Sequence, residues 1–555
     1  MRLVSLPAVA FRTAFALFCA NFITMLAMNA FRLSGQLQPW IYFVLFALFW
    51  WSIGRFIAPK NRLEELFSQR EATLLVGAVL LIGILYAGIR FQYLLEPLMH
   101  RLALPLEDDP SHLQELNSLI HAQRYPAQSS FTLTDYFYLY YAAWMLPVAL
   151  YKALPFGFVT FKVIQFLTNA IYSILFPLAL SYVVIEFAQS KRQIYWALYL
   201  GGFWSGLDFL IFFRHPFIPK AFWLMDLGFH LCFANYAQST TLTNHHLSSG
   251  IALICCAYLW NRYRGTGCVI FTSILLCYAF YSSVFVFLGG FPFIAYLWLR
   301  SFRSRATESL IVFGLSSALL FPLLWLFLRK PSAVAFEFPE QHSRTISLGS
   351  MHLHYGFVIG FLFFMVILAL QYGYFTYVLA FKRKTFSTHE AVLATLALAY
   401  LISCYFIGFS HANNYCMRGL IVPVFVLSWL ASSRMPAVNR KLAIVLIIAA
   451  LPVIPWLANP YLRGLKDTMH PHDFLQGTSA IVKLNMDRSI REVDFSKYAD
   501  LIAEKDGLRY AIEKMPMQSI QPLDIIDTEL ETKGPCGPWK WQRNPDIPAE
   551  PCPAK

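Results

Sequence analysis

Long runs of apolar residues recur along most of this chain and restrict its fold more than any other feature. Of its 555 residues, 57% are hydrophobic and 14% are charged, whereas a soluble domain averages roughly 25% charged residues. Runs of about twenty apolar residues match the length that a helix needs to cross the hydrocarbon core of a bilayer. Alternating ten-residue segments, which are typical of membrane β-barrels, do not occur. The sequence therefore predicts an all-α polytopic membrane protein.

The basic residues are concentrated in short connections between the apolar runs. The net charge is +13, yet residues 458–555 hold 13 Lys and Arg against 15 Asp and Glu, so the positive excess belongs to residues 1–457. Short loops rich in Lys and Arg are typical of the cytoplasmic side of membrane proteins, and they explain the charge without a nucleic-acid partner. We assign six of them to the cytoplasm: 58–71, 189–193, 262–265, 300–305, 382–384 and 434–441.

Placing these connections on one side gives a cytoplasmic N-terminus and an outside C-terminus, and therefore an odd number of spans. The first run, near 8–30, lacks a small-residue cleavage site and is expected to remain as a signal-anchor. Segment 135–188 holds one or three crossings, so the total is 13 or 15, and we favour 13. Segment 268–299 is expected to leave and return as two short helices, with the turn around 281–283 or 289–292.

The chain divides into two regions by composition. Residues 1–457 form the predicted transmembrane domain, and residues 458–555 form a small polar extension outside the membrane. In a bacterium this orientation corresponds to the inner membrane with a periplasmic extension. Eight of the ten cysteines lie in or beside apolar runs, where they are expected to be small core residues. Cys536 and Cys552 lie in the extension and could form a disulfide in an oxidising compartment.

Three consecutive acids, Glu107, Asp108 and Asp109, lie in the first large loop on the predicted outer side. Acidic side chains next to a bilayer are costly and are commonly functional. A carboxylate here could deprotonate an acceptor hydroxyl or hold a divalent cation. Alternatively, Asp109 caps a solvated surface helix that begins at Pro110 and carries His112. Spacing alone does not rank Asp108 and Asp109 as the base.

Three side chains that can carry positive charge lie at the predicted outer ends of later spans. Arg418 falls just inside an apolar run, where a charge needs an acidic partner or a phosphate group; snorkelling to the interface is the alternative. His245 and His246 open another span and could contact a phosphate or a sugar, or lie at the interface without a functional role. Adjacent residues point to different faces of a helix, so these two histidines are not expected to bind one metal ion.

Other polar and aromatic residues of the outer side are candidates for contacts to a sugar or an acceptor. Tyr138 belongs to an aromatic cluster at the start of an apolar run, which could stack on a sugar or form an interfacial aromatic belt. Asn413 and Asn414 could cap a helix or bind sugar hydroxyls. His352 lies at the expected start of a span, and His112 completes this group.

These features together resemble the GT-C superfamily, the multi-spanning glycosyltransferases that use polyprenyl-phosphate sugars. The acidic pair Asp108-Asp109 in the first large outer loop, the span start YFYLYYAAWMLPVALYKALPF and the late segment NNYCMRGLIVP carry the resemblance, which covers about residues 70–460. It implies a GT-C-like bundle of about 13 transmembrane helices with juxtamembrane helices on its outer face.

The resemblance also implies an activity and its residues. The acidic triplet 107–109 would supply the catalytic base of an inverting glycosyltransferase, and Arg418, His245 and His246 would bind the donor phosphate. The partners would be a lipid-linked sugar donor, membrane lipids, and a glycan, lipid or protein acceptor on the periplasmic face. The chain lacks the WWDYG-type motif of oligosaccharyl transferases, which argues against asparagine glycosylation.

Two other functions are alternatives. A transporter or flippase of a lipid-linked glycan commonly shows pseudo-repeats and polar residues near the midplane, and no repeat is visible. An O-antigen-type polymerase or ligase would favour paired arginines on large outer loops, and none is clearly placed. P-loop, dinucleotide, HExxH and GxSxG motifs are absent, so ATP-driven and serine-nucleophile chemistry is not expected. No cofactor is expected beyond, at most, a divalent cation.

Overall fold

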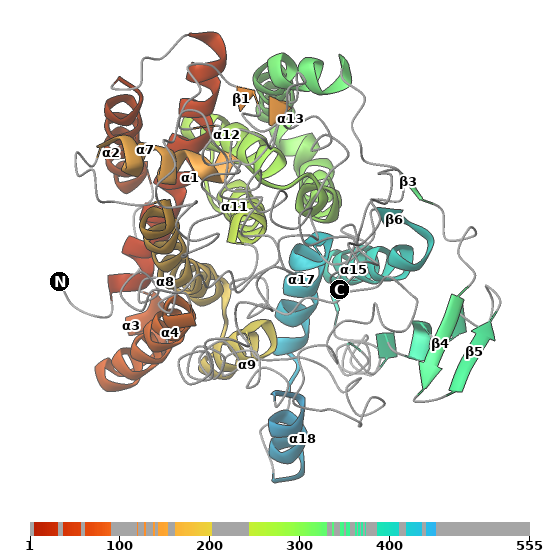
Figure 1. Cartoon of the computed structure of the whole chain (residues 1–555). Helices are drawn as coiled ribbons and strands as arrows, with labels where there is room; N and C mark the ends of the chain where they lie inside the picture. Colours follow the sequence, from red (N-terminus) through yellow and green to blue (C-terminus); the bar gives the residue numbers. More distant parts are fainter. Residues whose placement is uncertain are drawn as a thin grey trace, which may run out of the picture.

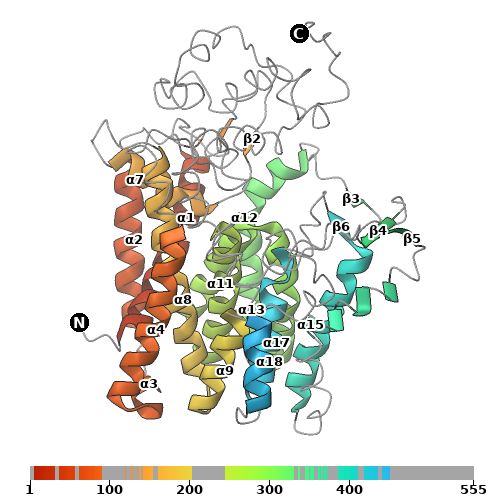
Figure 2. The ribbon, with the colours of Figure 1, turned by 60° about the horizontal axis from the view of Figure 1, so that its bottom comes forward.

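The structure of the chain is a computed structural model in which helices account for most of the described residues. The description covers residues 5–31, 37–56, 62–89, 119, 127–128, 137–138, 142–153, 161–202, 244–329, 336–337, 344–348, 351–355, 361–362, 364–366, 368–369, 372, 386–409, 418–435 and 440–450. Figures 1 and 2 show that the long helices stand side by side as one bundle, with α11 near its centre.

The helices follow the apolar runs of the sequence. They are α1 (Leu6–Ala30), α2 (Leu37–Phe56), α3 (Arg62–Leu66), α4 (Gln69–Ile89), the 3-10 helix η3 (Ala142–Trp144), α7 (Met145–Ala153), α8 (Phe161–Phe187), α9 (Lys191–Gly202), α11 (Asn244–Arg262), α12 (Thr266–Ser282), α13 (Val284–Arg329), α15 (Thr388–Phe406), α17 (Ile421–Ser432) and α18 (Arg440–Ala450). Within the described residues, six helices are long and apolar enough to cross a membrane: α1, α2, α4, α8, α13 and α15. A helical protein with several candidate membrane spans is therefore confirmed, while the total of 13 or 15 spans stays a prediction.

The helices differ in how much apolar surface they leave exposed. Helix α1 packs among α2, α8 and α12, and Phe15, Phe18 and Phe22 along it are completely buried. Helix α2, by contrast, leaves Trp40 71% and Leu48 55% exposed. Exposed apolar side chains along a long helix fit contact with lipid tails rather than with water.

Three short antiparallel strand pairs lie among the helices. Strand β1 (Ala127–Gln128) pairs with β2 (Phe137–Tyr138), β3 (Phe336–Glu337) with β6 (Gly408–Phe409), and β4 (Arg344–Leu348) with β5 (Met351–Tyr355). The expectation that Tyr138 and His352 open spans is therefore wrong, because Tyr138 lies in β2 and His352 lies in β5 opposite Ser347. For His352 the reason is visible in the sequence, since the pairing leaves only Gly-Ser between β4 and β5, a connection that favours a hairpin.

Aromatic contacts bring several helix ends together at one end of the bundle. The ring of Phe56 at the end of α2 lies 5.1 Å from that of Tyr263, just past α11. The ring of Phe187 at the end of α8 lies 5.5 Å from Tyr258 of α11 and 6.2 Å from Trp429 of α17. Helices α2, α8, α11 and α17 therefore all end at the same side, which we call the basic end.

Predicted cytoplasmic connections meet at the basic end. Arg62 Nη2 donates to the carbonyl of Ala188 over 3.3 Å, and Lys191 Nζ pairs with Glu71 at 2.6 Å. These bonds join the first predicted connection to the second. An exposed ion pair contributes only about 0–1 kcal/mol to stability. These contacts are informative here because they show that the two connections lie on the same side of the bundle.

A buried arginine, Arg305, links two further predicted cytoplasmic connections, 262–265 and 300–305. Arg305 has non-helical angles (φ −141°, ψ 31°), which divide α13 into two helices. Its guanidinium hydrogen-bonds the Trp260 carbonyl and Glu308 and lies 3.7 Å from the Trp260 ring centroid. Glu308 in turn accepts the N–H of Gly265 over 2.8 Å, and Gly265 has the positive φ of 86° that glycine tolerates best.

Helices α12 and α13 form a fold-back of three passes. Hydrogen bonds from Ser273 to the Val312 carbonyl (3.5 Å) and from Tyr281 to the Leu320 carbonyl (3.1 Å) align α12 in parallel with the second half of α13. The first half of α13 therefore returns from Ser283 to the basic end. The sequence left two positions for this turn, 281–283 and 289–292, and the helix break lies at the first of them.

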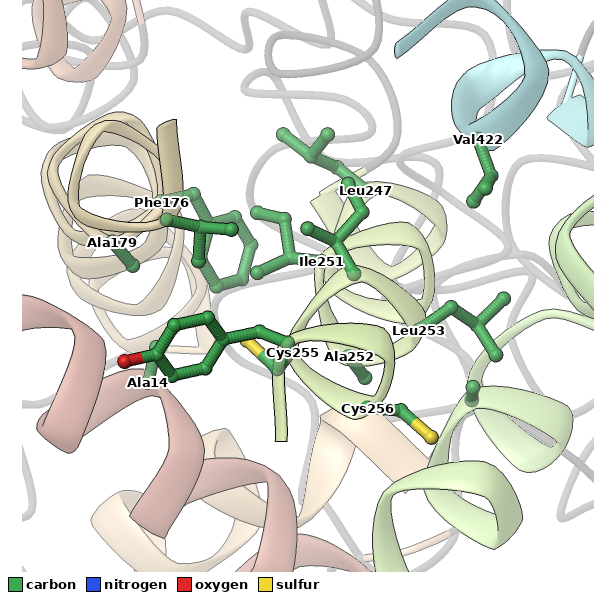
Figure 3. Packing of buried hydrophobic residues seen from close by; sticks show 14 of the residues in the cluster. Ala14, Phe176, Ala179, Leu247, Ile251, Ala252, Leu253, Cys255, Cys256 and Val422 are labelled. Atoms are coloured by element: carbon green, nitrogen blue, oxygen red, sulfur yellow. The ribbon is translucent and has the colours of Figure 1, made fainter. Parts of the chain in front are cut away.

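Helix α11 occupies the centre of the core. Figure 3 shows its Leu247 and Ile251 toward Phe176 of α8, and its Leu253 on the side of Val422 of α17. The described cysteines, which include Cys255 and Cys256 of this helix, are buried free thiols. Their expected role as small core residues is confirmed for the part of the chain that the structure describes.

Candidate functional site

Two adjacent histidines open α11 and are almost completely buried. His245 is 5% exposed and His246 is 1% exposed, and their imidazole centroids lie 3.9 Å apart at an angle of 49°. Nδ1 of His246 lies 2.7 Å from Oγ of Ser283, so the start of α11 is tied to the turn between α12 and α13. A hydrogen bond in such a dry environment is stronger than one at a surface.

The turn at Ser283 lies inside the bundle. Tyr281 is level with Leu320, and α13 continues nine residues further to Arg329, which is about 13 Å of helix. Irregular backbone at membrane depth requires partners within the protein. The partners here are the Ala279 carbonyl, which accepts the Ser283 N–H at 3.0 Å and the Ser249 hydroxyl at 2.7 Å.

The start of α11 is held to α12 by a second chain of hydrogen bonds. Tyr278 Oη donates to Ser248 Oγ over 2.9 Å, and Ser248 Oγ donates to the His245 carbonyl over 2.6 Å. Phe18 of α1 stacks on Tyr278 with the ring centroids 4.8 Å apart. Side chains from α1 and α12 therefore fix the backbone that carries both histidines.

Buried polar groups continue from α1 to α2 and α8. Tyr42 Oη donates to Asn21 Oδ1 over 3.0 Å, and the Asn21 amide donates to Tyr172 Oη over 3.5 Å. Tyr172 completes the chain by donating to the Ala143 carbonyl at 3.1 Å. We call the set Asn21, Tyr42, Tyr172, Tyr278, Ser248, His245, His246 and Ser283 the polar layer.

Arg418 lies one turn before α17 and reaches this region through a close crossing of helices. A Cβ on Gly289 of α13 would overlap the carbonyl oxygen of Gly419 and lie 2.7 Å from its carbonyl carbon. A Cβ on Gly250 of α11 would lie 2.6 Å from the Ile421 side chain of α17 and 3.6 Å from that of Val286. Because α11 and α17 both run toward the basic end, this contact places Arg418 near the level of the histidines.

Three helix starts therefore converge opposite the basic end: those of α11, α13 and α17. Each helix start carries a partial positive charge from its backbone dipoles, and its first N–H groups can bind an anion. His245 and His246 lie at the start of α11, and the half-buried Arg418 lies one turn before α17. A phosphate group is the ligand that this combination of charges favours.

The remaining predicted site residues are not brought into this cluster by the described structure. Glu107, Asp108, Asp109 and His112 lie outside the described residues, as do Asn413, Asn414 and residues 458–555 with both of their cysteines. Tyr138 and His352 lie in β2 and β5. The described residues therefore contain the predicted phosphate-binding group, and they leave the predicted base and sugar contacts untested.

Sequence reasoning missed most of the polar layer. Asn21 and Tyr42 are single polar residues within apolar runs, and only the cost of burying Asn21 could have drawn attention to it. Lys152 was also missed: it is half-buried in α7, outside the six candidate spans, where its Nζ donates to Gln38 Oε1. Burial lowers the pKa of the Lys152 ammonium to about 8.

Comparison with profiles of known protein families, with curated proteins and with solved structures finds no match. In the described part of the chain, no group of three or more His, Cys, Asp or Glu side chains could hold a metal ion. The proposal of a function below therefore depends on the chemistry of His245, His246, Arg418 and the three helix starts, and on the resemblance to the GT-C superfamily.

Proposed function

We propose that this chain is an integral membrane glycosyltransferase of the GT-C type, which takes its sugar from a polyprenyl-phosphate donor on the periplasmic face. The observation that supports this best is that His245, His246 and Arg418 lie at or just before the starts of the neighbouring helices α11 and α17, inside the bundle and on the side away from the basic end. Such a cluster suits a phosphate at the end of a lipid tail lying between apolar helices. The donor supplies the energy of transfer, so no nucleotide site is needed.

The proposed reaction is an inverting displacement. Asp108 or Asp109, with Glu107 beside them, takes the proton of an acceptor hydroxyl as its oxygen bonds to the anomeric carbon. The bond from that carbon to the phosphate oxygen breaks, and the polyprenyl phosphate leaves with the bonding electrons. Arg418, His245 and His246 would stabilise the charge that develops on the leaving phosphate.

The sugar and the acceptor would be held by other groups of the same side. We assign this role to His112, Tyr138, Asn413, Asn414 and His352, whose ring, amide and hydroxyl groups can stack on or hydrogen-bond a sugar. A divalent cation held by the acidic triplet 107–109 would be an optional addition.

The direct test is sugar transfer in membranes from a panel of polyprenyl-phosphate donors, with folded protein quantified in parallel. We expect D108N or D109N to reduce transfer at least about 10²-fold, and R418Q to reduce it by about 10²-fold or more. The matched control is R440Q, because Arg440 is an exposed arginine on α18. Unchanged transfer in both aspartate variants would refute the assigned base.

The helix break at Ser283 also favours a second candidate, a transporter or flippase of a lipid-linked glycan. Transporters bind substrates at discontinuous helices whose half-helix starts point at anionic groups, and α12 and α13 meet in such a break. Reconstituted vesicles separate the two: movement of a labelled donor across the bilayer without transfer, at wild-type level in D108N and D109N, would support the transporter.

A further inference from the structure

The turn between α12 and α13 places one serine hydroxyl between a histidine and a helix start. Ser283 is extended (φ −163°, ψ 107°) and 1% exposed. Its Oγ accepts the N–H of Val286 over 3.4 Å and lies 2.7 Å from Nδ1 of His246. A hydroxyl has one proton and two lone pairs, so the destination of this proton decides which tautomer His246 adopts.

The usual local acceptor for that proton is already occupied. A serine next to a helix commonly donates to the carbonyl four residues earlier, which is Ala279 for Ser283. That oxygen accepts the Ser283 N–H at 3.0 Å and the Ser249 hydroxyl at 2.7 Å, which uses both of its lone pairs. Among the described residues, Nδ1 of His246 is then the acceptor within hydrogen-bond distance of Ser283 Oγ.

We propose that Ser283 donates its hydroxyl proton to Nδ1 of His246 and so fixes the neutral imidazole with its own proton on Nε2. If the imidazole becomes protonated, Nδ1–H donates instead to the second lone pair of Ser283, and Nε2 keeps its proton. Nε2 is therefore a hydrogen-bond donor in both protonation states, as a site for an anionic phosphate oxygen requires. The other neutral tautomer would present a lone pair, which repels such an oxygen.

This assignment makes Ser283 a positioning residue for the phosphate site, a role that rests on the proposed function. The tautomer itself does not rest on that function, because the hydrogen bonds that fix it are all within the protein. The two parts can therefore be tested separately, with one spectroscopic measurement and one binding measurement.

The first measurement is nitrogen-15 NMR of histidine-labelled full-length protein in nanodiscs, with H246Q identifying the signal of His246. We expect the Nε2-protonated signature in the wild type and a mixture of tautomers in S283A. S283T keeps the hydroxyl and suits the extended backbone, so it should retain the wild-type signature. The matched control is S273A, which removes a buried hydroxyl of α12 that donates to the Val269 and Val312 carbonyls and has no bond to His246 or Ser283, so it should leave the His246 signal unchanged.

An Nδ1-protonated signature in the wild type, or an unchanged His246 signal in folded S283A, would overturn the tautomer assignment. If S283A does not fold, the signatures of the wild type and S283T still decide the question.

The second measurement is binding of polyprenyl phosphate to the same nanodiscs. S283A should bind about tenfold more weakly, because it loses the ordered donor at Nε2, while S283T and S273A should bind as the wild type does. Wild-type affinity in S283A would overturn the positioning role. Failure of the wild type to bind polyprenyl phosphate, with the Nε2-protonated signature present, would overturn the proposed phosphate site and leave the tautomer assignment standing.

Discussion

Gly289 of α13 lies so close to Gly419 that one added methyl group would disturb the helix crossing that positions Arg418. The variant G289A therefore tests this crossing. In G289A the new Cβ would overlap the carbonyl oxygen of Gly419 and lie 2.7 Å from its carbonyl carbon, whereas ordinary contact begins near 3.4 Å. Both obstructing atoms belong to backbone, so no flexible side chain can move aside. The two helices must therefore separate on the order of 1 Å at this point.

The cost of G289A is the difference between two opposing terms. Replacing glycine by alanine inside a helix gains about 1 kcal/mol, and overpacking a close contact costs about 1–3 kcal/mol, so we expect a net destabilisation of up to about 2 kcal/mol. A shift of about 1 Å would also move Arg418 relative to the phosphate that it is proposed to bind, and a hydrogen bond stretched by that much is largely lost, so we expect polyprenyl phosphate to bind about tenfold more weakly.

The matched control for this experiment is G314A in the second half of α13. A Cβ on Gly314 would meet nothing within 4 Å, so G314A should keep wild-type binding and gain up to about 1 kcal/mol of stability. Unfolding would be followed for both variants in one detergent, with binding measured in nanodiscs. Equal stability of G289A and G314A, together with unchanged binding, would refute the close crossing as the element that places Arg418.

Three further predictions follow from other parts of the structure. Arg305→Met should destabilise the protein by about 1–3 kcal/mol, because the Trp260 carbonyl and Glu308 lose the hydrogen bonds of a buried guanidinium. Arg303→Met, at an exposed position two residues away, should change the free energy of unfolding little, and equal effects of the two substitutions would contradict this role. Burial holds the pKa of Lys152 at about 8, below its ordinary value of 10.5, so the unfolded state binds more protons than the folded state between these two pH values. The stability of the wild type should therefore rise with pH across this window relative to that of K152M. An equal pH dependence of the melting temperature in the two proteins would contradict this prediction. In a cysteine-free background, single cysteines would be placed at two exposed positions, 264 at the basic end and 31 at the opposite end. In spheroplasts, the cysteine at 264 should be protected from an impermeant maleimide and the cysteine at 31 should react. The reverse pattern would show that the proposed topology is inverted.

Much of the helical architecture could be read from the sequence. Apolar runs in lipid must satisfy their backbone hydrogen bonds internally, and the helix is the element that does so within one segment. This is why α1 follows the predicted run near 8–30. The sequence also limits the turn of the 268–299 fold-back to two positions, 281–283 or 289–292.

The strands show where local patterns were insufficient. The segments containing Tyr138 and His352 are apolar enough to suggest span starts, yet both residues are paired in short ladders. Strand pairing depends on a partner segment, and the partner of Tyr138 is Ala127, eleven residues earlier in the chain. A helix forms within its own sequence, whereas a ladder requires two segments to meet.

The sequence by itself determined the class of the protein, the candidate spans and the grouping of basic connections at one end, because these follow from residue composition along single segments. Only the tertiary structure decided that Asn21, Tyr42 and Tyr172 form a polar layer, and that Ser283 contacts His246. Helices that are apolar on nearly all sides carry no periodicity to indicate which face meets which neighbour. Side chains far apart in the chain meet only when the whole bundle packs, so their hydrogen bonds are a property of that packing.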